Sequence, residues 1–172
     1  NRNIKRDLSV KIQEVIDALE LFAPLPLQES YDNAGLQVGL TGADVSGALL
    51  CLDVTEDVID DAVRRGFNLV ISHHPLLFRG LKQLSDADYV QRTVWKAVMN
   101  GVCIVSMHTN LDIAQNGVSE ELCKVLDLKD ISSVTASDGF ILKGGIISPV
   151  GADSFAERIK EKLGGNVKYV DG

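Results

Sequence analysis

Apolar residues near the start of the chain recur at intervals of three and four positions. This spacing predicts an amphipathic helix over residues 11–23, which Pro24 and Pro26 end. Its inward positions are Ile12, Val15, Ile16, Leu19 and Phe22. The stretch that follows, ESYDNAGLQVGLTG (29–42), is rich in Gly, Asn and Asp and predicts irregular backbone.

From residue 48 the pattern changes to short unbroken apolar runs that alternate with amphipathic segments. Buried strands are predicted over residues 48–54, 68–72 and 102–107. The spacing between them predicts one helix from a Thr55 cap to Gly66 and another that Gly101 closes, and a third helix around 118–126 follows. This alternation indicates an α/β fold with a mainly parallel sheet flanked by helices.

The last part of the chain repeats this pattern only in part. It predicts a strand over 140–148, a helix over 153–164 with an Asp153 cap, and a strand over 166–170. We therefore expect a two-lobed architecture, with a first α/β lobe over 10–130 and the start of a second lobe over 139–172. The sequence stops directly after a predicted strand, so we expect the second lobe to be incomplete, as in a truncated protein.

Composition narrows the class of protein. The chain of 172 residues is 45% apolar and 24% charged, the balance of a soluble globular protein. Its net charge of −7 disfavours nonspecific nucleic-acid binding, which depends on Lys and Arg. No apolar run is long enough to span a membrane, and NRNIKRDLSV has no signal-peptide core, so we expect a cytoplasmic protein. Three scattered cysteines are expected to be free buried thiols.

All three histidines of the chain follow predicted strands directly. His73 and His74 end the second strand, and His108 ends the third, with Asp112 four residues later. Asp53 ends the first strand. Ligands of open parallel sheets bind outside the carboxyl ends of the strands, so this edge is the predicted site.

The histidine pair is followed by Pro75, which favours extended backbone at His74. Successive side chains of extended backbone point to opposite sides, so the two imidazoles are expected to reach different ions of a two-metal site, about 3.5–4 Å apart. Asp112 is a candidate bridging carboxylate. Imidazole and carboxylate ligands indicate two divalent ions of zinc, iron or manganese rather than calcium.

Each of these residues also has a simpler interpretation. The histidine pair could belong to a surface loop, and His108 could orient a ligand or hydrogen-bond to backbone instead of binding metal. Asp112 and Asp53 could cap local turns. YDNAG (31–35) could be a plain turn or a loop over the site.

Three segments together resemble one known family. YDNAGLQVG, LDVTEDVIDDAVRRGFNLVISHHPLLF and SMHTNLDIAQNGV are similar to the Ngg-interacting-factor-three-like proteins, dinuclear-metal proteins that carry the name GTP cyclohydrolase I type 2 homologues. The resemblance is close over 10–130 and weaker over 139–172. It implies two similar α/β lobes and homo-oligomers in the form of hexameric rings.

The resemblance also implies roles for individual residues. His73 and His74 would bind different ions, Asp112 would share the ion of His74, and His108 would line the site, where it orients a ligand or transfers a proton. The family has two further ligands, a histidine and a glutamate, in a C-terminal stretch, but no histidine follows His108 here. These ligands would come from a longer chain or a neighbouring subunit. Tyr31 stands where the family usually has tryptophan, and an inserted domain of some members would join near 130–140.

Two functions compete at this stage. The first is a metal-dependent hydrolase acting on a small-molecule or phosphorylated substrate, with His108 in proton transfer. The alternative is a non-catalytic metal-binding or protein-interaction module. The sequence contains neither GxGxxG nor GxxxxGK[ST], which slightly favours the alternative. A plain α/β scaffold without metal is the third and weakest interpretation.

Overall fold

The computed structural model describes residues 9–134 and 140–170. The chain forms two compact units that divide between Leu111 and Asp112. The predicted join near 130–140 includes residues 135–139, which lie outside the described residues. The lobe boundaries predicted from the sequence stay a prediction.

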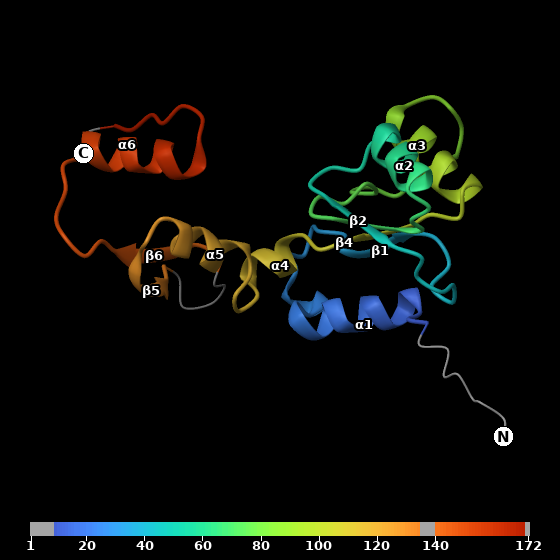
Figure 1. Cartoon of the computed structure of the whole chain (residues 1–172), viewed down its shortest axis with the longest axis horizontal. Helices are drawn as coiled ribbons and strands as arrows, with labels where there is room; N and C mark the ends of the chain where they lie inside the picture. The colour runs from blue at the N-terminus through green and yellow to red at the C-terminus, as the bar shows by residue number, and fades with distance from the viewer. Residues whose placement is uncertain (1–8, 135–139, 171–172) are drawn as a thin grey trace, which may run out of the picture. The chain divides into compact units, whose positions relative to one another are not determined.

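A four-stranded sheet forms the centre of the first unit (Figure 1), in the order β1-β4-β3-β2. The strands are β1 (Gly35–Val38), β2 (Ala48–Cys51), β3 (Leu69–Ser72) and β4 (Cys103–Ser106). β2, β3 and β4 are parallel, whereas β1 runs antiparallel to β4. The mainly parallel α/β fold is thereby confirmed.

Strand β1 corrects the sequence analysis, which predicted irregular backbone over 29–42. Gly35 and Gly39 enclose the strand and have φ values of 95° and 112°, which favour glycine. The turn-like composition of residues 29–42 does not indicate the strand of four residues that they contain. This strand forms because its backbone groups pair with those of β4, and the local sequence pattern carries no information about that pairing.

Helices cover both faces of this sheet (Figure 1). α1 (Ile12–Phe22) packs on one face, where Ile12 and Ile16 contact strand residues. α2 (Glu56–Arg64) and α3 (Tyr89–Met99) pack on the other. Alternate strand residues face the two layers: Leu69, Cys103 and Val105 lie on the α1 side, and Val70 and Ile104 lie on the α2 and α3 side.

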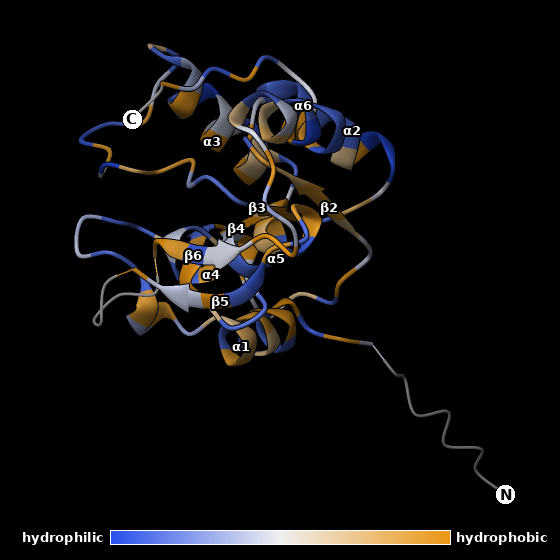
Figure 2. Cartoon of the chain, turned by 90° about the vertical axis from the view of Figure 1, so that its left-hand side faces the viewer, coloured by the Kyte–Doolittle hydropathy of each residue, from blue (hydrophilic) through white to orange (hydrophobic). Residues whose placement is uncertain are grey.

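Local signals explain where the helices begin and end. The Thr55 hydroxyl accepts a hydrogen bond from the Val58 amide at 3.3 Å, as the predicted cap requires. Gly66 follows the helix with a φ of 72°. Figure 2 shows β2 as apolar, whereas α2 carries both hydrophilic and hydrophobic residues. The helix is amphipathic, as predicted, with Ile59 and Ala62 buried. The prediction of a buried strand is wrong for β2, because β2 lies at an edge of the sheet and its residues alternate between exposed and half-buried.

The second unit contains α5 (Val118–Val125), a hairpin of β5 (Lys129–Ser133) and β6 (Leu142–Gly145), and α6 (Ala152–Leu163). The short helix α4 (Thr109–Ile113) precedes them, and a 3-10 turn (Leu25–Leu27) follows α1 in the first unit. Arg158 and Lys162 of α6 both pair with Asp127 at 2.7 Å. The helices predicted around 118–126 and over 153–164 and the strand within 140–148 are present.

Three details of the second unit differ from the prediction. β5 was not predicted, because its polar sequence KDISS lacks a strand pattern and it forms by pairing with β6. Gly151, not Asp153, is the cap residue of α6, and Asp153 lies in the first turn. Residues 166–170 are not a strand, since no neighbouring strand among the described residues pairs with them. Within the described ranges, no helix has the length and apolar character that crossing a membrane requires.

Candidate metal centre

His73 and His74 lie in a bend that begins where β3 ends at Ser72. The His73 amide donates to the Cys51 carbonyl at 3.1 Å, and the His74 amide donates to the Leu52 carbonyl at 2.9 Å. Successive amides of a regular strand face opposite neighbours, so two consecutive bonds to the β2 side show that the alternation has ended.

This bend corrects the expectation that the two rings point to opposite sides. Their centroids lie 4.9 Å apart with an interplanar angle of 55°. Two successive residues of a strand would hold their rings on opposite sides, but β3 ends at Ser72, before either histidine. The number of ions that the pair could hold is a separate question and stays a prediction.

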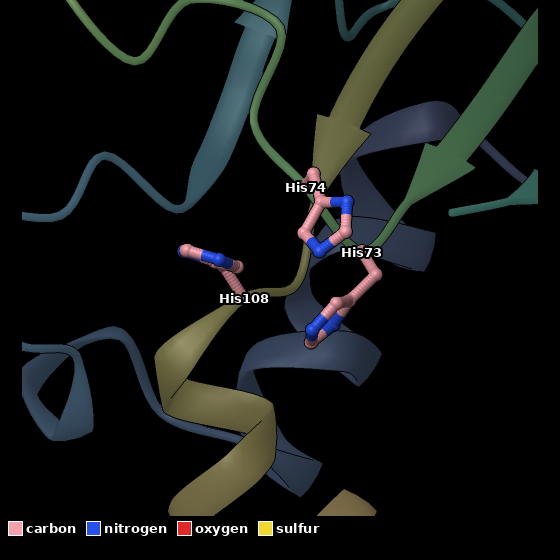
Figure 3. Close-up of side chains that lie close together, drawn as sticks. All are labelled: His73, His74 and His108. Atoms are coloured by element: carbon pink, nitrogen blue, oxygen red, sulfur yellow. The ribbon is translucent and has the colours of Figure 1, made fainter. Parts of the chain in front are cut away.

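His108 completes a cluster of three imidazoles (Figure 3). It follows β4 directly before α4, and its ring centroid lies 5.2 Å from that of His73 and 5.6 Å from that of His74. Each of the three residues offers one ligand nitrogen, and these nitrogens lie within 4.8 Å of one another. The carboxyl ends of two neighbouring parallel strands thus bring all three histidines of the chain together.

Every imidazole of the cluster is held through its Nδ1 atom. The acceptors are the Met107 carbonyl for His73 at 2.9 Å, Asp53 for His74 at 2.8 Å and Asp32 for His108 at 2.8 Å. Because all three acceptors are oxygens, Nδ1 carries a proton in each ring, and in the neutral form of the imidazole Nε2 then carries the lone pair. Histidines that bind metals through Nε2 almost always donate their other nitrogen in this way.

Asp32 was not singled out by the sequence, although it lies in the YDNAG segment. Its side chain is fully buried and accepts hydrogen bonds from His108, the Thr109 amide and hydroxyl, and the Asn33 amide. Burial raises the pKa of the Asp32 carboxyl, but the bonds from Thr109, His108 and Asn33 outweigh it and hold the pKa below its ordinary value. YDNAG is therefore a loop that supports the cluster.

Asp53 and Asp112 have different places in the structure. Asp53 follows β2 and accepts from His74, while Thr55 alone supplies the side-chain cap of α2. Asp112 lies on α4 and is the first residue of the second unit. Metal ligation by Asp112 stays a prediction, as does a role of His108 in proton transfer.

A cavity of about 370 Å³ opens beside His74. Its lining includes Asp53, Pro75 and the ring of Tyr89. The Phe78 ring meets the His108 ring edge to face at 6.4 Å. The cluster therefore borders a space for a small molecule and, at His108, one aromatic ring.

Three histidines fixed for Nε2 coordination, at the carboxyl edge of a parallel sheet, define an α/β protein with a candidate transition-metal centre. Comparison with known proteins gives the family: the model of Duf34/NIF3 (NGG1p interacting factor 3) matches residues 10–172, and the chain belongs to this family. The resemblance read from its motifs is confirmed.

Bacterial relatives carry the name GTP cyclohydrolase 1 type 2 homolog. The chain is 32% identical to that of Staphylococcus epidermidis over 154 residues, which are 90% of the chain and 41% of the relative. It is 34% identical to that of Clostridium acetobutylicum over 136 residues, or 79% and 50%. The chain thus spans half or less of the length of these relatives.

Solved structures show the same fold. Reduced HcgD from Methanocaldococcus jannaschii superposes with a TM-score of 0.80 at 27% identity, covering 91% of this chain and 62% of that one. Staphylococcus aureus protein SA1388 superposes with a TM-score of 0.68 at 37% identity, covering 73% and 36%. Both neighbours are longer than this chain.

Proposed function

We propose that the chain carries the histidine part of a divalent-metal centre that serves a hydrolase. The observation that supports this most is the convergence of three imidazoles whose Nδ1 atoms are all hydrogen-bonded to oxygens. His73 and His74 are the proposed histidine ligands of two ions, with Asp112 as the carboxylate ligand. The donor set suits zinc, iron or manganese.

In this proposal, the residues of the chain have separate roles around the ion. A bound divalent ion would supply Lewis acidity and would lower the pKa of a water molecule bound to it to about 7. Asp53 and the Met107 carbonyl keep the two ligand rings in the tautomer with Nε2 unprotonated. His108 accepts a proton from water, and buried Asp32 stabilises the imidazolium that results, as an aspartate does in catalytic triads.

The substrate class follows from the relatives and from the space available. The relatives' name points to hydrolytic chemistry on a nucleotide, and the cavity beside His74 accommodates a small molecule. Because the chain spans only part of those relatives, the missing ligands and the complete activity belong to the same proposal. So does the hexameric ring that the family resemblance implies.

The experiment is an assay of the chain loaded with Zn²⁺, Mn²⁺ or Fe²⁺ against GTP and a panel of phosphoesters, beside His73→Ala and His108→Asn. Wild type is expected to turn over at least one substrate. His73→Ala is expected to lose both metal and turnover, whereas His108→Asn keeps metal and loses about 10²–10⁴-fold in turnover. Wild type and His73→Ala that are equally inactive on every substrate contradict the hydrolase.

A non-catalytic metal-binding or interaction module is the second candidate, favoured by the absence of both nucleotide-binding motifs from the sequence. Its signature is metal removal that lowers the melting temperature while no substrate is turned over. If His108→Asn also loses its metal, His108 is a ligand and not the proton acceptor.

A further inference from the structure

Two buried serines lie side by side where β3 and β4 end. Ser72 and Ser106 are register partners in the parallel ladder, and their exposed fractions are 2% and 0%. Their hydroxyl oxygens lie 2.8 Å apart. Buried polar groups need hydrogen-bond partners, so what these hydroxyls contact is informative.

Both hydroxyls are directed to the carbonyl of His74. Ser72 Oγ lies 2.9 Å from this oxygen, and Ser106 Oγ lies 3.4 Å from it. The two hydroxyls have one proton each to donate. Both protons are used if Ser106 donates to Ser72 and Ser72 donates to the His74 carbonyl, which are the two shorter contacts. A short chain of donors thus ends on one backbone oxygen.

This oxygen belongs to the residue that forms the bend. The His74 amide is already bound to Leu52, and the next residue, Pro75, has no amide hydrogen to extend the ladder. With its amide and its carbonyl both held, the backbone of His74 is fixed on both sides. The direction of its side chain is then set, and Asp53 fixes the remaining rotation of the ring.

We infer that Ser72 and Ser106 are positioning residues of the metal centre: they hold the bend in which the imidazoles of His73 and His74 face the same side as His108. The inference rests on the proposed metal-binding function for its affinity test, but the bend itself is a property of the metal-free chain. Ser72 is the primary contact, and Ser106 acts through it.

The first test measures Co²⁺ affinity by chelator competition, together with the visible absorption of bound Co²⁺, for Ser72→Ala, Ser106→Ala and the double variant. Ser72→Ala is expected to bind about tenfold more weakly, the lower end of the range for groups that orient metal ligands. The Co²⁺ affinity of Ser106→Ala is expected to stay within about threefold of wild type, because the bond from Ser72 to the His74 carbonyl remains. The double variant is at least as weak as Ser72→Ala, since Ser106 can no longer reach the carbonyl.

Thr93→Val is the matched control. Thr93 is fully buried in the same unit, and its hydroxyl donates to the Tyr89 carbonyl within α3 at 2.7 Å and not to the backbone of His74. This variant also loses one buried hydroxyl, so its stability falls in the same manner as that of the serine variants. Its Co²⁺ affinity and spectrum are expected to match wild type.

The second test needs no metal. Long-range ¹H–¹⁵N spectra of the imidazoles report which nitrogen of each ring is protonated. Ser72→Ala is expected to change the His74 signals and leave those of His108 unchanged, because Asp32 holds His108 independently. Unchanged His74 signals in Ser72→Ala and in the double variant overturn the inference.

The two tests separate the possible failures. A wild-type chain that binds no Co²⁺ contradicts the proposed function, and the imidazole spectra then decide the positioning role alone. A wild-type chain that binds Co²⁺ as tightly as the double serine variant contradicts the positioning role and leaves the proposed function standing.

Discussion

At the scale of single residues, the tautomer of each imidazole is decided by the oxygen it faces. Asp32 is the most constrained of these partners, because its two oxygens accept from four donors. One oxygen accepts from His108 and the Asn33 amide, and the other accepts from the two groups of Thr109. No neutral isostere can satisfy all four, since an amide presents a donor on one side.

Asp32→Asn is therefore expected to reverse the tautomer of His108. If the amide nitrogen faces His108, the exposed bond from Asn33 is lost and both bonds from Thr109 remain. His108 Nδ1 must then accept a hydrogen bond from the amide, so the proton of the imidazole moves to Nε2. The free energy of unfolding falls by about 1–3 kcal/mol, because the second N–H of the buried amide then faces the Asn33 N–H and has no acceptor. Imidazole ¹⁵N spectra and urea unfolding measure the two effects.

Asp53→Asn is the comparison for this change. Asp53 holds only His74, and its side chain is 70% exposed, so the unfolding free energy is expected to stay close to that of wild type. A His108 ring that keeps Nδ1–H in Asp32→Asn means that Asp32 does not select the tautomer.

The sequence located the histidines because each directly follows an apolar run that is recognisably a strand. It could not locate Asp32, whose role depends on a contact with His108 across 76 positions in a segment of turn composition. The only signal was the place of YDNAG among the segments that resemble the family. The sequence-based prediction also placed the rings of His73 and His74 on opposite sides. The bend that brings them together is held by Ser72 and Ser106, and the local pattern of apolar and polar residues does not indicate such a bend.

At the scale of elements, the strands with strong apolar runs were predictable and the strands made by pairing were not. β2 is apolar throughout, and β3 and β4 are apolar up to a final serine, so their sequences alone predict strands. β1 and β5 are no shorter, but they are rich in polar or glycine residues, so each takes its conformation from its neighbour. Position 39 illustrates how closely β1 and β4 approach each other.

Gly39→Ala is expected to destabilise the first unit by about 1–3 kcal/mol, because a side chain strains a residue with positive φ. Here φ is 112°, and the added Cβ would lie 2.8 Å from the Cα of Cys103 on β4, where the backbone cannot move aside. Chemical denaturation followed by circular dichroism measures the loss.

Gly42→Ala provides the control within the same loop. Nothing lies within 4 Å of its added Cβ, and its φ is not in the positive region, so its unfolding free energy should equal that of wild type or exceed it slightly. Equal stability of the two variants would mean that β1 does not approach β4 as closely as described.

At the scale of the whole molecule, the three histidines all belong to the first unit, which ends at Leu111. Asp112 begins the second unit, and no histidine follows His108 in the sequence. The hexameric ring and the cytoplasmic location stay predictions.

Metal binding should stabilise the chain by mass action, because the unfolded chain does not hold the three imidazoles together. At a metal concentration 100 times the dissociation constant, the gain is about 2.7 kcal/mol. Calorimetry is therefore expected to show a melting temperature that rises with Zn²⁺ and returns on addition of a chelator. The double variant His73→Ala/His74→Ala should show no such rise, and a rise equal to that of wild type would place the stabilising ion elsewhere in the chain.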